Sequence, residues 1–366
     1  MRRSRWLAPW KDSSEKRAIY HCVSRVVDRR FVFGDEERER FRMFMRMQEN
    51  FSGCRVLAYC IMSNHFHILL EVPPAGALLL DDEGLLKRLL AVYSEAFVAV
   101  VGKELAEARA EGDEAHVAEI YERFTYRMHD LSEFMKTLLQ RFTRWFNLTH
   151  DRTGTLWEQR FKSVIVESGD ASRTIAAYID LNPVRAGMVS DPADYRWSSY
   201  GEAIGGGNKG NGKKARIGLM RACATPSSEF KTLNTGEERD GHDAEGWEET
   251  SRTYRRLMGL ALGRKSGRAV VGEAGPGVIM NTEELLSSKH NGTGLPNLGM
   301  AKMLRTRVRY FSDGAVIGSR SFVNEAFDAA RERFSEKRKD GARRMRGIGK
   351  QTGGMLWSVR DLRVRV

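Results

Sequence analysis

Residues 55–72 read RVLAYCIMSNHFHILLEV, and this stretch decides the fold. It holds two apolar runs, 55–62 and 65–72, separated only by Ser63 and Asn64. Short apolar and β-branched runs bounded by turn residues are typical of strands, and a two-residue break is typical of a hairpin. We therefore predict two neighbouring strands joined by a tight turn.

Five further segments surround this hairpin in a β-α-β-β-α-β-α order. From periodicity and helix-end signals we expect a strand, a helix, a second helix, a strand and a third helix at residues 18–25, 35–52, 131–147, 160–167 and 172–181. Four mostly antiparallel strands with helices on one face form the split-βαβ arrangement. The sequence thus predicts an α+β, ferredoxin-like domain.

Composition divides the rest of the chain. Residues 76–129 are rich in Leu, Ala and Glu with helical periodicity, so we expect a helical insertion in the domain at 1–203. Residues 204–245 begin with a glycine-rich run and predict a flexible linker. Residues 246–366 predict a mostly helical, basic extension with a possible role in DNA binding.

The charge balance favours a polyanionic partner. The 366 residues include 60 Lys and Arg against 48 Asp and Glu, a net charge of +12, and nucleic acid is the first candidate for such a basic protein. Four cysteines without a C-x-x-C pair predict reduced thiols. We find no signal-peptide pattern and no uncharged apolar span, which predicts a cytoplasmic, nucleoid-associated protein without membrane contact.

His65 and His67 form the first half of a candidate catalytic centre. Side chains two apart on a strand project from the same face, with their backbones about 7 Å apart. This spacing suits two ligands of one metal ion, although two half-buried sheet histidines would produce the same pattern. Phe66, between them, is expected to point into the helix-covered core.

Tyr178 and Asn182 form the second half, four residues apart and hence on one face of a helix. We expect Asn182 to be the last residue of that helix, because the following Pro183 disfavours helical backbone before it. Two neutral imidazoles and one amide oxygen make an open three-ligand metal site. A tyrosine one turn away could attack a phosphorus that the metal polarises. Alone, Tyr-x-x-x-Asn is a weak pattern, since most such tyrosines pack against a sheet.

Three motifs in order resemble the REP-associated tyrosine transposases, a branch of the single-tyrosine HUH transposases. They are IMSNHFHILLEVP at 61–73, GTLWEQRFKSVIVE at 154–167 and AAYIDLNPVRAGMVSDPADYRWSSY at 176–200. The resemblance covers about residues 16–203. It implies a ferredoxin-like core that cuts and rejoins single-stranded DNA beside palindromic hairpins. The insertion at 76–129 departs from the compact pattern of the family.

By this resemblance, His65 and His67 correspond to the HUH pair, Asn182 to the third metal ligand and Tyr178 to the nucleophile. The family implies a divalent cation, Mg²⁺ or Mn²⁺, and a transient 5′-phosphotyrosine link. It also implies single-stranded DNA and DNA hairpins as partners, bound by a monomer or a homodimer.

Basic residues near these motifs are candidate DNA contacts. Arg25 lies at the end of the first predicted strand, and Arg160 and Lys162 lie on the strand before the nucleophile helix. Each could position a phosphate, although a solvated turn or strand edge explains them equally well.

Two other functions compete with a nuclease. One is a domesticated, non-catalytic protein that recognises repeat hairpins, although an intact set of four site residues argues against it. The other is a relaxase, which shares the H-x-H chemistry but usually carries a third histidine or paired tyrosines.

Overall fold

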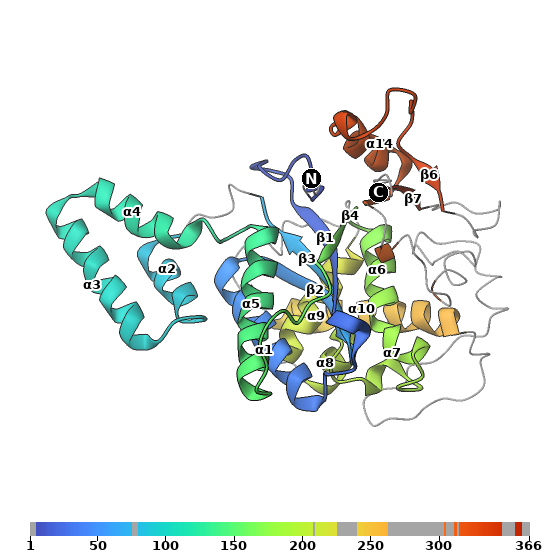
Figure 1. Cartoon of the computed structure of the whole chain (residues 1–366), viewed down its shortest axis with the longest axis horizontal. Coiled ribbons are helices and arrows are strands. Elements are labelled where there is room, and N and C mark those ends of the chain that lie inside the picture. The colour runs from blue at the N-terminus through green and yellow to red at the C-terminus, as the bar shows by residue number, and fades with distance from the viewer. Residues whose placement is uncertain are drawn as a thin grey trace. The chain divides into compact units, whose positions relative to one another are not determined.

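Two compact units make up the chain, Met1–Ile165 and Val166–Val366, and each is described by itself. The structure is a computed structural model that describes residues 5–74, 80–207, 209–224, 240–262, 304, 311–312, 315–345 and 356–360 (Figure 1). The two units divide between Ile165 and Val166, whereas the sequence predicts a domain boundary at residue 203. The predicted extension at 246–366 lies in part outside the described residues.

A sheet with the strand order β2-β3-β1-β4 forms the centre of the first unit. Its strands are β1 (Ala18–Arg25), β2 (Arg55–Ile61), β3 (His65–Val72) and β4 (Lys162–Val166). The β3 strand pairs antiparallel with both β1 and β2. This is the strand order of the split-βαβ arrangement, so the ferredoxin-like prediction is confirmed.

Two helices cover one face of this sheet, α1 (Asp35–Ser52) and α5 (Leu131–Thr149). An acidic first turn suits the positive end of α1, and Gly53 ends the helix with a left-handed φ of 72°. Between helices and sheet lies a cluster of aromatic rings, in which the Phe41 centroid is 4.7 Å from Phe66 and 5.1 Å from Phe142. Phe66 thus points into the helix-covered core, as predicted.

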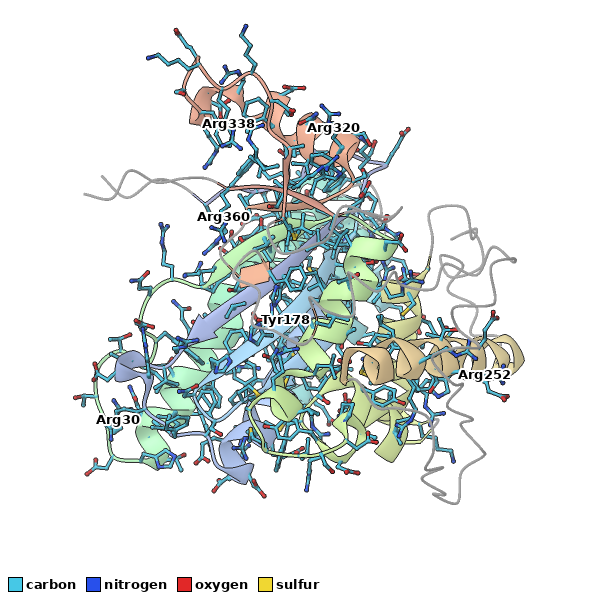
Figure 2. The ribbon with its side chains drawn as sticks, turned by 90° about the vertical axis from the view of Figure 1, so that its right-hand side faces the viewer. Arg30, Tyr178, Arg252, Arg320, Arg338 and Arg360 are labelled. Atoms are coloured by element: carbon cyan, nitrogen blue, oxygen red, sulfur yellow. The ribbon has the colours of Figure 1, made fainter. Side chains whose placement is uncertain are left out.

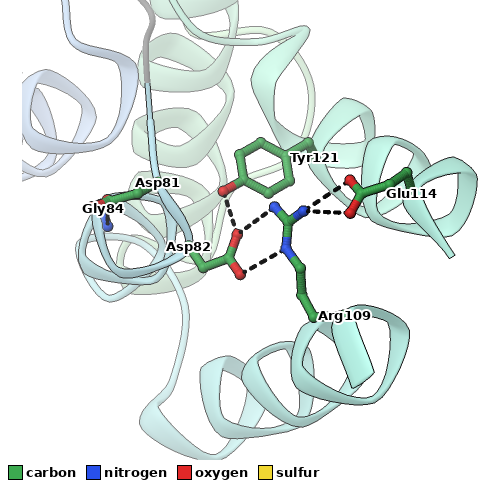
Figure 3. A network of polar contacts seen from close by, with 6 residues as sticks. All are labelled: Asp81, Asp82, Gly84, Arg109, Glu114 and Tyr121. Carbon is green, nitrogen blue, oxygen red and sulfur yellow. Dashed lines mark hydrogen bonds and ion pairs between the residues drawn. The ribbon is translucent and has the colours of Figure 1, made fainter. Parts of the chain in front are cut away.

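The insertion is helical, as predicted, and has a small core of its own. Its helices are α2 (Asp82–Leu89), α3 (Glu95–Glu111) and α4 (Glu114–Thr125). Arg109 of α3 donates hydrogen bonds to Asp82 of α2 and to Glu114 of α4 (Figure 3). Tyr121 donates to the same Asp82 carboxylate at 2.6 Å. This network joins the three helices at one point.

The second unit corrects the prediction of a flexible linker at 204–245. It contains α6 (Asp170–Asp180), α7 (Asn182–Arg185), α8 (Ser199–Gly205), α9 (Gly210–Cys223) and α10 (Asp240–Leu262). The α9 helix lies within the predicted linker and packs against α8, with Leu219 fully buried. The glycines serve this contact, because a Cβ atom on Gly212 would lie 2.4 Å from the Gly206 carbonyl carbon. Residues 208 and 225–239 of the linker prediction lie outside the described residues.

Where the structure describes it, the C-terminal extension contains helices and also short strands. The helices are the part of α10 after residue 245 and α14 (Arg320–Asp328), and the strands are β5 (Val316–Gly318), β6 (Arg343–Arg344) and β7 (Trp357–Val359). These three strands pair antiparallel in the order β5-β7-β6. Helical periodicity did not reveal strands of two or three residues, which are too short to show alternation. Within the described residues, no helix has the length and apolar character needed to cross a membrane.

Candidate active site

His65 and His67 lie on β3, with ring centroids 5.2 Å apart. His65 is half-buried and His67 is 4% exposed. The β1 strand places Arg25 directly opposite His65 and Val23 directly opposite His67. Since directly paired residues of antiparallel strands share a face, the predicted histidine pair and Arg25 lie on the same side of the sheet.

Each histidine has a polar partner at its Nδ1 atom. His65 Nδ1 lies 2.7 Å from Asn64 Oδ1, and His67 Nδ1 lies 2.9 Å from His21 Nε2 of β1. A hydrogen bond at one ring nitrogen orients an imidazole and leaves the other nitrogen for a metal. In both histidines the Nδ1 contact therefore helps to fix the orientation of the ring.

Tyr178 lies on α6 of the second unit (Figure 2). Its ring packs edge-on against Phe311, with centroids 4.9 Å apart, and the Arg185 guanidinium carbon is 4.2 Å from the ring centroid. Arg185 also donates hydrogen bonds to the carbonyl oxygens of Tyr178 at 2.5 Å and Leu304 at 3.0 Å. Both the backbone carbonyl and the ring of Tyr178 are therefore in contact with neighbouring residues.

We predicted that Asn182 is the last residue of the nucleophile helix. The structure instead places it at the start of the short helix α7. Pro183 is tolerated there because a proline in the first turn lacks only an N–H that would have no partner within the helix. Asn182 Nδ2 donates to the carbonyl oxygens of Tyr178 and Ile179, both at 3.2 Å. With its nitrogen facing these carbonyls, the amide has its oxygen Oδ1 for a ligand.

The four predicted site residues divide between the two units, with the histidines in the first and Tyr178 and Asn182 in the second. Their meeting around one ion stays a prediction. Within the described residues, no group of three or more His, Cys, Asp or Glu side chains could hold a metal ion. The predicted ligand set contains an amide in place of a third such side chain. Two oriented imidazoles and an amide oxygen fit a divalent cation of the Mn²⁺ type.

Asp180 anchors the helix that carries Tyr178. It is fully buried, and its carboxylate accepts hydrogen bonds from Ser199 Oγ, the Tyr200 backbone N–H and Tyr254 Oη at 2.9, 3.0 and 2.7 Å. These contacts join α6 to α8 and α10. Burial raises the pKa of Asp180 to about 6, and the donated hydrogen bonds oppose this rise only in part.

We expect the Asp180→Asn variant to change how stability depends on pH. A folded-state pKa above the unfolded value of about 3.9 means that the folded protein binds the extra proton between pH 4 and 6. The wild-type free energy of unfolding should then fall by about 3 kcal/mol as pH rises through this window. In Asp180→Asn this fall should be absent in urea titrations. Asp194→Asn, which removes an exposed carboxyl, should keep the wild-type slope.

The three residues predicted to contact phosphates differ in their exposure to solvent. Arg25 is half-buried at the end of β1, whereas Arg160 and Lys162 are exposed. Arg160 lies before β4 and not on it, because the strand begins only at Lys162. Their contacts with DNA stay predictions.

Other nucleophiles are poorly suited to attack a phosphate. All four cysteines are free thiols, and burial raises the pKa of Cys22, Cys54 and Cys223 to about 12. The expected reduced state agrees with these free thiols. Burial also raises the pKa of Tyr254 well above its usual value, and its hydroxyl is bonded to Asp180. These groups are held protonated in structural positions.

Two residues around the site escaped the sequence analysis. Asn64 was interpreted only as a turn residue, and Arg185 was not singled out. Arg185 lies three positions after Asn182 in the same motif, and that helical spacing was the one signal available. For Asn64, the adjacent histidine was the corresponding signal.

Residues 14–79 match the family model described as "Transposase IS200 like". The matched stretch includes both histidines, and it confirms over these residues the resemblance that the motifs indicated. A solved structure described as "Structure of the REP associates tyrosine transposase bound to a REP hairpin" is similar at 13% identity and a TM-score of 0.35. The similarity covers 58% of this chain and 88% of that chain. No curated protein is significantly similar to the chain in sequence.

Proposed function

We propose, from the match to IS200-like transposases, that this chain is a metal-dependent transposase acting on single-stranded DNA. It would cut and rejoin a strand next to palindromic hairpin repeats through a covalent 5′-phosphotyrosine. The observation that carries the proposal is the His65–His67 pair, in which both Nδ1 atoms have polar partners. A pair of sheet histidines with only a packing role needs no such matched orientation.

In this proposal, His65, His67 and Asn182 would hold one divalent cation, Mg²⁺ or Mn²⁺. When bound, such a cation would supply Lewis-acid polarisation of the phosphate and would offset the negative charge that develops there. Tyr178 Oη forms a bond to phosphorus, the bond from phosphorus to the 3′ oxygen breaks, and the phenolic proton is lost. The departing oxygen gains a proton and becomes a free 3′-hydroxyl. Since the phosphotyrosine keeps the energy of the broken bond, rejoining needs no ATP.

Arg185 and Asp180 support Tyr178 in this reaction. Arg185 places a positive charge against the tyrosine ring, and such a cation favours negative charge developing on the phenol oxygen. Asp180 fixes α6 against neighbouring helices. Because Tyr178 is only 2% exposed, an incoming strand has to displace residues that pack over its ring.

The test is a cleavage assay on a labelled oligonucleotide that carries a hairpin with single-stranded flanks. We expect cleavage and a denaturant-resistant protein–DNA adduct with Mn²⁺ or Mg²⁺, and neither product with EDTA. Binding without cleavage under any divalent cation would instead support the alternative, a non-catalytic protein that recognises repeat hairpins. Cleavage in EDTA would contradict the metal-dependent mechanism.

A further inference from the structure

The loop between β1 and α1 exposes an aromatic ring. Phe31 is 82% exposed, whereas Phe33, two residues later, is 2% exposed and packs 5.3 Å from Phe142. Alternation along the chain therefore places one phenylalanine in the core and the other in solvent. A single exposed apolar residue is common on protein surfaces, so the surroundings of Phe31 decide whether it has a role.

The backbone of this loop is held in a defined shape. Asp28 and Arg29 both have a φ of 56°, in the left-handed region that non-glycine residues seldom adopt. The Val27 N–H donates to the Leu156 carbonyl oxygen at 2.9 Å, and Asn64 Nδ2 donates to the Arg29 carbonyl oxygen at 2.8 Å. The ring of Phe31 is thus presented from a preformed support.

Two positively charged residues come directly before Phe31 in the loop. Arg29 and Arg30 are both exposed, and neither forms an ion pair with a residue that the structure describes. Arg30 is labelled in Figure 2. By contrast, Arg38 on the neighbouring helix is paired with Asp35 at 3.0 Å. The loop carries one acidic residue, Asp28, so its net charge is positive.

The loop is connected to a predicted metal ligand through one side chain. Asn64 donates from Nδ2 to the Arg29 carbonyl oxygen, and its Oδ1 lies 2.7 Å from His65 Nδ1. The backbone of the loop and the ring of His65 are therefore held by the same Asn64 side chain.

We propose that residues 29–31, the Arg-Phe loop, bind unpaired nucleotides of the DNA substrate. Phe31 stacks on one base, and Arg29 and Arg30 contact the adjoining phosphates. Aromatic faces flanked by cations are the chemistry that recognises single strands, since bases inside a duplex are already stacked. This assignment rests on the proposed function, because it takes single-stranded DNA as the substrate.

The experiment measures DNA affinity by fluorescence anisotropy in EDTA, where no cleavage is expected. One probe is a hairpin with a single-stranded flank, and the other is the same hairpin with a blunt end. Phe31→Ala should weaken binding of the flanked hairpin about tenfold, and Phe31→Trp should restore it. Binding of the blunt hairpin should not change. The double variant R29A/R30A should reduce the salt dependence of binding by a slope of about 1.4, or about 0.7 for each lost phosphate contact.

Tyr126→Ala is the matched control. Tyr126 is also an exposed aromatic beside an arginine, at 61% exposure, but it lies on the insertion, where residues 76–129 hold eleven acidic and six basic residues. This control should bind both probes like wild type. Unchanged binding by Phe31→Ala would overturn the assignment and leave a protein or lipid surface as the occupant. Equal weakening on both probes would also overturn it, because the loop would then contact the hairpin and not the unpaired flank. Cleavage by wild type is scored separately, so failure of the loop assignment is distinct from failure of the nuclease.

Discussion

Tyr178→Phe is expected to abolish cleavage and the covalent adduct while DNA affinity stays at the wild-type level. The substitution removes only the Oη atom that would bond to phosphorus. The ring keeps its packing against Phe311 and the Arg185 guanidinium, so the fold and the bound DNA should be unaffected. Because no other group replaces a lost covalent nucleophile, we expect cleavage to fall by at least about 10⁴-fold.

This result is read on denaturing gels, as loss of the cut strand and of the protein-linked strand. Tyr195→Phe is the control, since Tyr195 is also buried and lies in the same motif but has no amide four residues later. It should cut like wild type. Cleavage that survives in Tyr178→Phe would assign the nucleophile to another residue.

His67→Ala is expected to remove metal-dependent cleavage by weakening the binding of Mn²⁺. The variant loses one of two imidazoles, and even the loss of a residue that only orients a ligand typically lowers metal affinity by 10–100-fold. We therefore expect at least about 100-fold weaker Mn²⁺ binding by calorimetry, which does not depend on turnover. Cleavage should become undetectable at Mn²⁺ concentrations that saturate the wild type.

His116→Ala provides the comparison, because His116 lies on the helical insertion and is outside the predicted ligand set. It should bind Mn²⁺ and cut DNA like wild type. Melting of both variants without metal separates a lost ligand from a lost fold, since His67 is buried in the sheet. Wild-type Mn²⁺ affinity in His67→Ala would exclude this histidine from the site.

Much of the first unit could be predicted from local pattern. The expected strands at 18–25 and 65–72 coincide with β1 and β3, and the expected helix at 35–52 coincides with α1. Each of these segments has strong periodicity and clear end signals, such as the acidic turn after Gly34 and the glycine at 53. Local signals of this kind act within a few residues of the chain, so they can be recognised without the rest of the fold.

The errors arose where distant packing outweighs local composition. A glycine-rich run is typical of linkers, but at Gly212 it permits close contact between α8 and α9. Pro183 suggested a helix end at Asn182, yet it lies in the first turn of the next helix. Composition records the residue types and contains no information about which neighbour they meet.

The sequence by itself determined the ferredoxin-like order of elements, the face shared by His65 and His67, and the residue types on which the proposed metal-dependent cleavage would depend. Only the tertiary structure decided which atoms orient these residues. The register of β1 against β3 places His21 within hydrogen-bond distance of His67. The fold of the chain after α6 places the Arg185 guanidinium against the Tyr178 ring. Strand alternation and helical spacing follow from backbone geometry within one segment, whereas contacts between segments depend on how the whole chain packs.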